Sequence, residues 1–173
     1  MKNLISAILT AATIAGVVSI PFVAKAQAQS EANEQAIEAE FQCLALNIYF
    51  EARSDNLAGK AAVADVVINR TKDRRYPASI CEVVHQGRQD ANGNMIRNQC
   101  QFSWYCDGKS DDPKNLELWN ESQIIAYNML THGKYRGITE GATHYHATYV
   151  NPRWAADLQQ VGQIGAHVFY RWE

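Results

Sequence analysis

The sequence predicts a single α+β domain in which helices come first and short strands come late. The chain has 173 residues, which is enough for one domain and little more. Apolar residues recur at helical spacing through most of the chain, whereas two short aromatic-rich segments near its end alternate as strands do. Helices and strands that are segregated along the sequence are typical of α+β folds.

The composition is that of a globular protein. Hydrophobic residues make up 47% of the chain and charged residues 20%, so a packed core is expected. The formal net charge is −2, without the basic excess that nucleic-acid binding usually requires. Nucleic acid is therefore not expected as a partner.

Residues 1–26 are predicted to be a signal peptide. Lys2 gives a positive start, residues 4–24 carry no charge, and residues 24–26 have the small-x-small pattern that signal peptidase reads. We expect cleavage after Ala26, with cleavage after Ala28 nearly as good. The alternative is an uncleaved anchor, because the apolar run approaches the length of a membrane span. Cleavage predicts an exported protein, periplasmic, in the cell envelope or secreted, with no stable membrane span.

Residues 27–40 are rich in Gln, Ala and Glu and predict a linker or a solvated helix, and residues 41–173 predict the folded domain. Apolar residues at helical spacing predict helices over residues 41–52, 58–72 and 116–130. Asp55 and Asn56 are placed to cap the second helix. The third helix is expected to turn four residues inward: Trp119, Ala126, Tyr127 and Leu130.

The second half of the domain contains shorter elements. Residues 80–85 form a short apolar segment, and residues 86–99 are polar with an Asn-Gly-Asn turn signal, which predicts an exposed loop or hairpin tip. Residues 142–150 and 166–172 alternate and are rich in aromatic side chains, so they predict strands of a small sheet.

Four cysteines follow the predicted cleavage site: Cys43, Cys81, Cys100 and Cys106. An even number of cysteines in an exported chain predicts two disulfides, and all three pairings remain open. Four buried thiols are the alternative. A cysteine-based zinc site is less favoured, since no pair has the close two-residue spacing of common zinc sites.

Glu51 is the candidate general acid. It lies between Phe50 and Ala52 in an apolar helical stretch, where an ionised carboxylate would be poorly solvated. Burial raises the pKa of a carboxyl group, and a general acid needs a raised pKa near neutral pH. The alternative is a surface glutamate that pairs with Arg53 or Lys60.

A series of motifs runs in order through nearly all of residues 43–172. They are Ile48-Tyr49-Phe50-Glu51-Ala52-Arg53-Ser54, Gly59-Lys60-Ala61-Ala62-Val63-Ala64, Val67-Ile68-Asn69-Arg70, Tyr76-Pro77, Ile80-Cys81-Glu82-Val83-Val84, Cys100-Gln101-Phe102-Ser103-Trp104, Asn151-Pro152 and Ile164-Gly165-Ala166-His167-Val168-Phe169. In this order they resemble the SleB/CwlJ-type cell wall hydrolases. The resemblance implies a mostly helical, lysozyme-like fold and peptidoglycan cleavage, often by lytic transglycosylation. It also implies that Glu51 is the catalytic glutamate of the Tyr-x-Glu-Ala-Arg motif.

Asp55 bears on which reaction is expected. The family often has Gly-Glu where this chain has Ser54-Asp55, which keeps a carboxylate at the second position. Glycosidases need two carboxylates about 5–10 Å apart, and Asp55 would share a helical face with Glu51 if the helix continued. A lytic transglycosylase needs only one, and no other partner for Glu51 is evident. This favours cleavage of the MurNAc-GlcNAc strand to 1,6-anhydro-MurNAc ends.

Substrate-binding residues are expected in two further stretches. Gln101, Phe102, Ser103 and Trp104 place aromatic rings beside amide and hydroxyl groups, as sugar subsites do. Alternatively, Phe102 and Trp104 point into the core and leave the two polar side chains to the cleft.

Asn69 and Arg70 end an apolar helical stripe, where a polar side chain could orient substrate or Glu51, although a helix-terminal cation is the plainer interpretation of Arg70. Tyr145 and His146 are expected on the far wall of the cleft.

Two other functions compete with this interpretation. His144 and His146 lie on one face of the predicted strand, so with a third ligand they could bind zinc, as in a zinc-dependent N-acetylmuramoyl-L-alanine amidase. A secreted module that binds cell-wall glycan without cutting it would also use aromatic stretches. The favoured expectation is a monomeric enzyme that acts on peptidoglycan glycan strands without metal or other cofactor.

Overall fold

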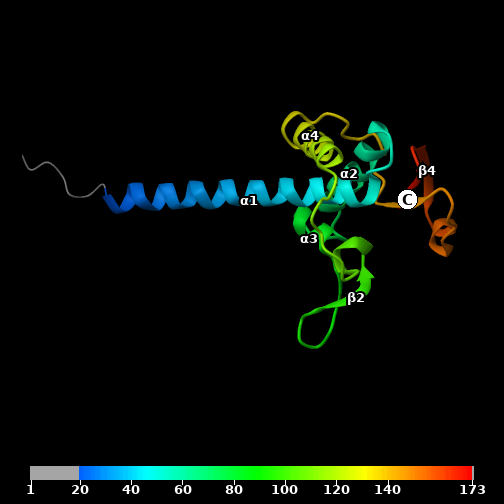
Figure 1. The fold of residues 1–173 in the computed structure, drawn as a ribbon, viewed down its shortest axis with the longest axis horizontal. Coiled ribbons are helices and arrows are strands. Elements are labelled where there is room, and N and C mark those ends of the chain that lie inside the picture. Colours follow the sequence, from blue (N-terminus) through cyan, green and yellow to red (C-terminus); the bar gives the residue numbers. More distant parts are fainter. Residues whose placement is uncertain (1–19, 173) are drawn as a thin grey trace, which may run out of the picture. The chain divides into compact units, whose positions relative to one another are not determined.

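The computed structural model describes residues 20–172, which Figure 1 draws as a ribbon. The signal peptide prediction for residues 1–26 falls mostly outside the described residues and stays a prediction. The chain divides into two compact units, residues 1–35 and 36–173. Within the described residues, none of the helices combines the length and the apolar character that crossing a membrane requires.

Helix α1 (Ile20–Ala52) contributes to both units, and its residues 24–39 are exposed. The second unit contains the other elements in chain order. These are α2 (Leu57–Lys72), α3 (Ile80–Val84), β1 (Gly87–Gln89), β2 (Met95–Cys100), the 3-10 helix η1 (Ser103–Cys106), α4 (Leu116–His132), β3 (His144–Ala147), the 3-10 helix η2 (Arg153–Asp157), β4 (Gln159–Ile164) and β5 (His167–Arg171). Helices precede a small late sheet, so the predicted α+β class is confirmed.

Helix α2 forms the centre of the second unit. Its N-cap is Asn56, whose side-chain oxygen accepts the Gly59 N–H at 2.9 Å, as the sequence predicts. Small and β-branched residues make the helix buried almost throughout residues 59–68. Because these side chains are short, the end of α1 and helix α4 can approach closely, and Leu44, Ile48 and Met129 are fully buried around it.

The late sheet has the strand order β3-β5-β4, with both pairs antiparallel. Strands β3 and β5 were expected from their aromatic alternation. Strand β4 was not expected, since its sequence Gln-Gln-Val-Gly-Gln-Ile has few large apolar residues and its burial is only partial. Its place in the sheet depends on backbone pairing with β5, which propensity does not reveal.

Strands β1 and β2 form the predicted exposed hairpin. Gly93 at its tip has φ +83°, a conformation that glycine adopts without strain. The Asp90 carboxylate accepts the backbone N–H groups of Asn92 and Asn94 and so closes the turn.

The prediction that Tyr127 and Leu130 face inward from α4 is wrong. Tyr127 is 53% exposed and Leu130 is 37% exposed, whereas Ala126 is buried as expected. The buried face of α4 instead combines Ala126 with Ser122, Ile125 and Met129. These positions keep the spacing of one helical face, but that face is rotated from the one that Tyr127 and Leu130 define.

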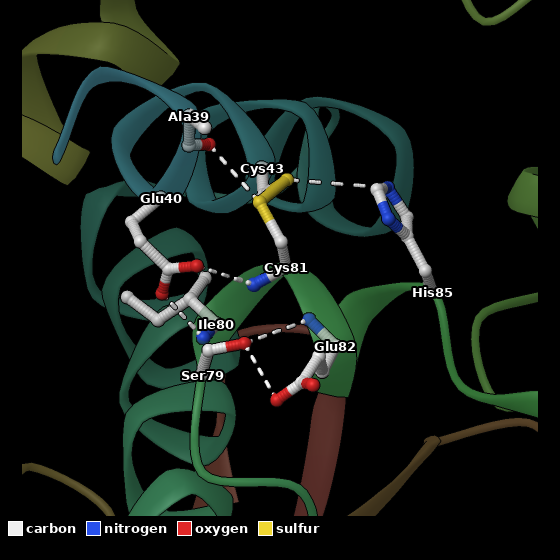
Figure 2. Close-up of a disulfide and its surroundings, with 8 residues drawn as sticks. All are labelled: Ala39, Glu40, Cys43, Ser79, Ile80, Cys81, Glu82 and His85. Carbon is white, nitrogen blue, oxygen red and sulfur yellow. Dashed lines mark hydrogen bonds between the residues drawn. A yellow bond between two sulfur atoms is a disulfide. The ribbon is translucent and has the colours of Figure 1, made fainter. Parts of the chain in front are cut away.

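Both disulfides are present, Cys43–Cys81 and Cys100–Cys106, and the alternative of four thiols is wrong. Figure 2 shows Cys43–Cys81 joining α1 to α3. Beside it, the Glu40 carboxylate accepts the backbone N–H groups of Ile80 and Cys81 at 2.5 and 3.3 Å, so α1 also caps the start of α3. These contacts, made by Glu40 and Cys43, fix the last turns of α1 against α3.

Removing the two disulfides should have unequal effects on stability. The cysteines of Cys43–Cys81 are 38 residues apart and those of Cys100–Cys106 are 6 apart. If loop-closure entropy dominates, replacing the first pair by serine lowers the free energy of unfolding by about 4 kcal/mol, and replacing the second by about 2 kcal/mol. Urea titration of the two double variants measures this difference, and equal losses would contradict it.

Candidate active site

A cleft of about 400 Å³ lies where the end of α1 meets β3. Its lining residues come from α1, α2, the segment after β2, and the region from β3 to β5. They are Glu51, Arg70, Gln101, Phe102, His144, Tyr145, His146, Ala147, Tyr149, Val150, Trp154 and His167. Five of the predicted site residues are therefore brought together here: Glu51, Gln101, Phe102, Tyr145 and His146.

Glu51 is the one carboxylate among those lining residues of the described chain. It occupies the last turn of α1, and its Oε2 accepts a hydrogen bond from the Tyr145 hydroxyl at 2.9 Å. Burial raises the pKa of the Glu51 carboxyl, while the Tyr145 hydrogen bond and the Arg70 charge oppose that rise. The group therefore holds its proton to a higher pH than an exposed glutamate does, as a general acid requires.

Tyr145 projects from β3 toward Glu51. Its ring packs against those of His167 and Phe169 on the neighbouring strand β5, which fixes the position of the hydroxyl. Burial, followed by the nearby Glu51 charge, raises the pKa of Tyr145 well above its usual value. The phenol consequently remains protonated and acts as a donor to the carboxylate.

Arg70 lies near the end of α2 and is only 6% exposed. Its Nε donates to the Thr143 carbonyl at 2.8 Å, and its guanidinium packs over the rings of Tyr76 and Phe102, with Cζ 5.2 Å from each centroid. Its Nη1 has no hydrogen-bond partner among the described residues. Arg70 therefore places a buried positive charge at the cleft, which favours the ionised form of Glu51.

The stretch after β2 does not alternate as a strand does, because Ser103 begins the 3-10 helix η1. Phe102 and Trp104 are 2% and 7% exposed and belong to the core, as the alternative interpretation stated. The Trp104 indole N–H donates to Asn47, and its ring stacks on Phe50. Ser103 and Trp104 do not line the cleft. They line a second cavity on the other side of the last turn of α1.

Asn69 does not line the cleft either. Its side-chain amide donates to the Thr139 hydroxyl and the Ala142 carbonyl, at 3.1 and 3.0 Å. The residue therefore holds the segment that leads into β3 against α2. Any effect on substrate is indirect, through the position of that strand.

His144 and His146 do share one face of β3, since both rings pack against Trp154. His146 Nε2 lies 2.9 Å from the Tyr170 hydroxyl. Burial, helped by the charges of Arg70 and Arg75, lowers the pKa of His144 to about 4. In the part of the chain that the structure describes, no three His, Cys, Asp or Glu side chains gather as a metal site would require.

Asp55 is not placed across the cleft from Glu51. Helix α1 ends at Ala52, so the two carboxylates do not share a helical face. The Asp55 carboxylate accepts the Ala166 N–H at 2.9 Å and lies 3.3 Å from His167 Nδ1. A Cβ at Gly59 or Gly165 would overlap this carboxylate, so both glycines are needed where they are. Asp55 thus secures the β4–β5 turn to the start of α2.

The cleft also contains residues that the sequence did not single out. Trp154 from η2 and the 88%-exposed Tyr149 form an aromatic wall beyond His146. The Asn151-Pro152 motif between them was the one signal of their importance, and it gave no role to either ring. Aromatic faces of this kind are suited to the C–H surfaces of sugar rings.

Comparison of the sequence with known families gives the class of the protein, an enzyme that degrades the cell wall. Residues 54–170 match the Cell Wall Hydrolase family, so the chain belongs to it. The matched stretch begins three residues after Glu51, so the assignment of Glu51 as the catalytic acid stays a prediction from its motif and from the geometry of the cleft. No curated protein matches the chain.

Two solved structures share the fold. One is the catalytic domain of the germination-specific lytic transglycosylase SleB from Bacillus anthracis, with 23% identity, a TM-score of 0.57, and coverage of 77% of this chain and 94% of that domain. The other is the catalytic domain of the Bacillus cereus SleB protein, with 23% identity, a TM-score of 0.57, and coverage of 78% and 91%. The chain therefore has the fold of these two SleB catalytic domains.

Tyr145→Phe should move the pH dependence of catalysis. The lost hydrogen bond favoured ionised Glu51, so the pKa of Glu51 rises further and the acid keeps its proton to higher pH. The alkaline limb of the profile of kcat/KM against pH is expected to shift upward. Tyr170→Phe is the matched control, because it removes a hydroxyl that bonds His146 instead. An unmoved limb in Tyr145→Phe would contradict the coupling.

Arg70→Gln should raise the pKa of Glu51 for a different reason, since it removes the attractive charge. It also leaves the Thr143 carbonyl without its donor, so the free energy of unfolding should fall by about 1–3 kcal/mol. Arg70→Lys keeps the charge and should restore the pH profile more fully than the stability. If the lysine and glutamine variants have the same alkaline limb, Arg70 does not act through charge.

Proposed function

We propose that this protein is a peptidoglycan lytic transglycosylase in which Glu51 acts first as acid and then as base. The observation that carries the proposal is the environment of Glu51. Its partly buried, tyrosine-bonded carboxyl is the one carboxylate among the lining residues of the described cleft. The fold shared with the germination-specific lytic transglycosylase SleB from Bacillus anthracis supports this reaction.

The first step requires a protonated carboxyl group. Because burial raises its pKa, Glu51 retains a proton that it donates to the glycosidic oxygen as the bond from that oxygen to C1 of MurNAc breaks. The positive charge that develops on the sugar lies near Glu51, which is becoming a carboxylate. The ionised form is then stabilised by the Tyr145 hydroxyl and the buried Arg70 charge.

The second step returns the proton. The 6-hydroxyl of the same MurNAc attacks C1 and gives its proton to the Glu51 carboxylate, which closes the 1,6-anhydro ring. No water is consumed, and the carboxyl group is ready for another cycle. A neutral tyrosine and a fixed arginine need not exchange protons during either step, which is consistent with their burial and hydrogen bonding.

Simple hydrolysis would require a second carboxylate to activate water or to act as nucleophile. Asp55 is the nearest in sequence, and its oxygens are taken by Ala166, His167 and the backbone N–H of Asn56. Its side chain is 7% exposed, so it has little room to contact a sugar. These contacts support transglycosylation over hydrolysis.

The proposed substrate lies outside the cytoplasmic membrane, which agrees with the predicted signal peptide over residues 1–26. The proposed enzyme is exported. It acts as a monomer and uses no metal or other cofactor. The substrate-binding surface would comprise Gln101, His146 and the wall of Tyr149 and Trp154, with Tyr145 positioned to hold Glu51.

Glu51→Gln should lower kcat on purified peptidoglycan by about 10³-fold, because the amide cannot donate or take back the proton. Binding to insoluble peptidoglycan should persist, since the fold and the aromatic wall remain. Glu117→Gln, at an exposed position on α4, is the matched control. Unchanged turnover in Glu51→Gln would refute the catalytic assignment, and absence of turnover in the unsubstituted protein would favour a binding module.

Mass spectrometry of the digested products identifies the bond. We expect anhydro-muropeptides, which are one water lighter than the reducing muropeptides that hydrolysis gives. Reducing ends would assign a glycosidase. Free stem peptides, with activity lost to a chelator, would assign the zinc amidase instead.

A further inference from the structure

The cavity beside the last turn of α1 is separate from the residues used in the proposed reaction. It measures about 320 Å³, and we call it the loop cavity because most of its lining residues belong to the loop after η1. Three groups of residues line it. They are Tyr49 and Phe50 from α1 with Arg53 just after its end, Ser103 and Trp104 from η1, and Asp107, Lys109, Ser110, Asp111, Asp112 and Lys114 from the loop that follows.

The loop cavity adjoins the Glu51 cleft. Phe50 lines the cavity and the next residue, Glu51, lines the cleft. In the same way, Phe102 lines the cleft and Ser103 lines the cavity. The cleft and the loop cavity are therefore lined by consecutive residues of the chain at Phe50–Glu51 and again at Phe102–Ser103.

The floor of the loop cavity is aromatic and rigid. The rings of Phe50 and Trp104 stack with their centroids 4.8 Å apart. The Tyr49 hydroxyl accepts the backbone N–H groups of Lys114 and Asn115, at 3.1 and 3.0 Å, and so fixes the end of the loop. The Cys100–Cys106 disulfide fixes its beginning. A surface held in this way loses little conformational entropy when a ligand binds.

Charges of both signs surround this floor, and two of them are left without an opposite charge. Lys109 pairs with Asp107 at 3.2 Å and Lys114 with Asp112 at 3.7 Å. Among the described residues, neither Arg53 nor Asp111 forms an ion pair, and they do not pair with each other across the cavity.

The surroundings of Asp111 favour a positively charged partner for its carboxylate. Burial, then the like charges of Asp107 and Asp112, raise the pKa of the Asp111 carboxyl, and only the charge of His85 opposes them. A positively charged ligand group at this position would be favoured, because it would relieve repulsion that the protein itself does not neutralise.

We propose that the loop cavity binds the stem peptide of peptidoglycan, with Arg53 contacting a peptide carboxylate and Asp111 contacting the free amine of the diamino acid. The proposal rests on the proposed glycan-cleaving function. Glycan hydroxyl and acetamido groups are uncharged and would not use this pair of charges. An uncrosslinked stem peptide carries a carboxylate and an amine, and it is attached to the same muramic acid that is cleaved.

The test compares peptide-bearing glycan strands with strands from which an amidase has removed the peptides and in which the lactyl carboxylates so exposed have been converted to amides. The unsubstituted protein should have the higher kcat/KM on peptide-bearing strands. In Arg53→Gln and in Asp111→Asn, the ratio of kcat/KM on the two substrates is expected to fall about tenfold, mainly through KM, because each loses a charge-assisted hydrogen bond. Arg88→Gln and Glu117→Gln are matched controls at exposed positions outside both cavities, and they should keep the ratio.

Chemical modification of the substrate distinguishes the two contacts. Acetylating the diamino-acid amine should lower kcat/KM of the unsubstituted protein by the same factor as Asp111→Asn, with no further loss when the two are combined. Amidating the peptide carboxylates should lower kcat/KM of the unsubstituted protein by the same factor as Arg53→Gln, again with no further loss when the two are combined. Additive losses would show that the partners are assigned wrongly.

Equal losses on both strand types would overturn the proposal, because the two residues would then serve the glycan or the fold. Unchanged ratios in both variants would overturn it as well. The proposed reaction is judged separately, from the anhydro ends formed on peptide-free strands. Those ends can be present while the peptide preference is absent, so the two failures are distinguishable.

Discussion

The site depends on one hydrogen bond between side chains that are 94 residues apart, from the Tyr145 hydroxyl to the Glu51 carboxylate. Glu51 ends the last turn of α1, and Tyr145 lies on β3 in the late sheet. A charged group cannot be buried at such a junction without a partner that offsets its desolvation. The bond leaves the carboxyl desolvated enough to have a raised pKa, while its ionised form still has a donor.

Much of the second unit can be understood as the means of holding those two ends together. The Cys43–Cys81 disulfide and Glu40 fix α1 to α3, so the last turn of α1 has a defined position. On the opposite side, Asn69 and Arg70 at the end of α2 bind the segment that leads into β3. Helix α2 thus packs against the end of α1, which carries Glu51, and holds the segment before β3, which carries Tyr145. The buried Asp65 in the middle of α2 acts in the same sense, because it accepts the backbone N–H groups of Gly137 and Thr139 ahead of β3.

The sequence was most informative where a local rule or an ordered motif operates. The cap at Asn56, the Asn-Gly turn and the periodicity of α2 are local, and all were predicted correctly. Glu51 stood out because an acidic residue in an apolar stretch conflicts with simple burial. Tyr127 and Leu130 were placed wrongly because the rotation of α4 depends on what α1 and α2 present to it. The partners of Asn69 lie 70 and 73 residues away, for which a single sequence has no signal. Strand β4 pairs with β5 close by in the chain, but through backbone hydrogen bonds that its own side chains do not announce.

The departure at Ser54-Asp55 also acquires a physical reason. A shorter carboxylate fits between Gly59 and Gly165, where it binds the Ala166 N–H and stays beside His167. Asp55 thereby holds the sheet that carries Tyr145, since the ring of His167 packs against the ring of Tyr145. Asp55 therefore affects Glu51 through the sheet and not across the substrate. If the second acidic position has this structural role, a single carboxyl group must both give and recover the proton, and the sugar's own hydroxyl is the nucleophile that returns it directly.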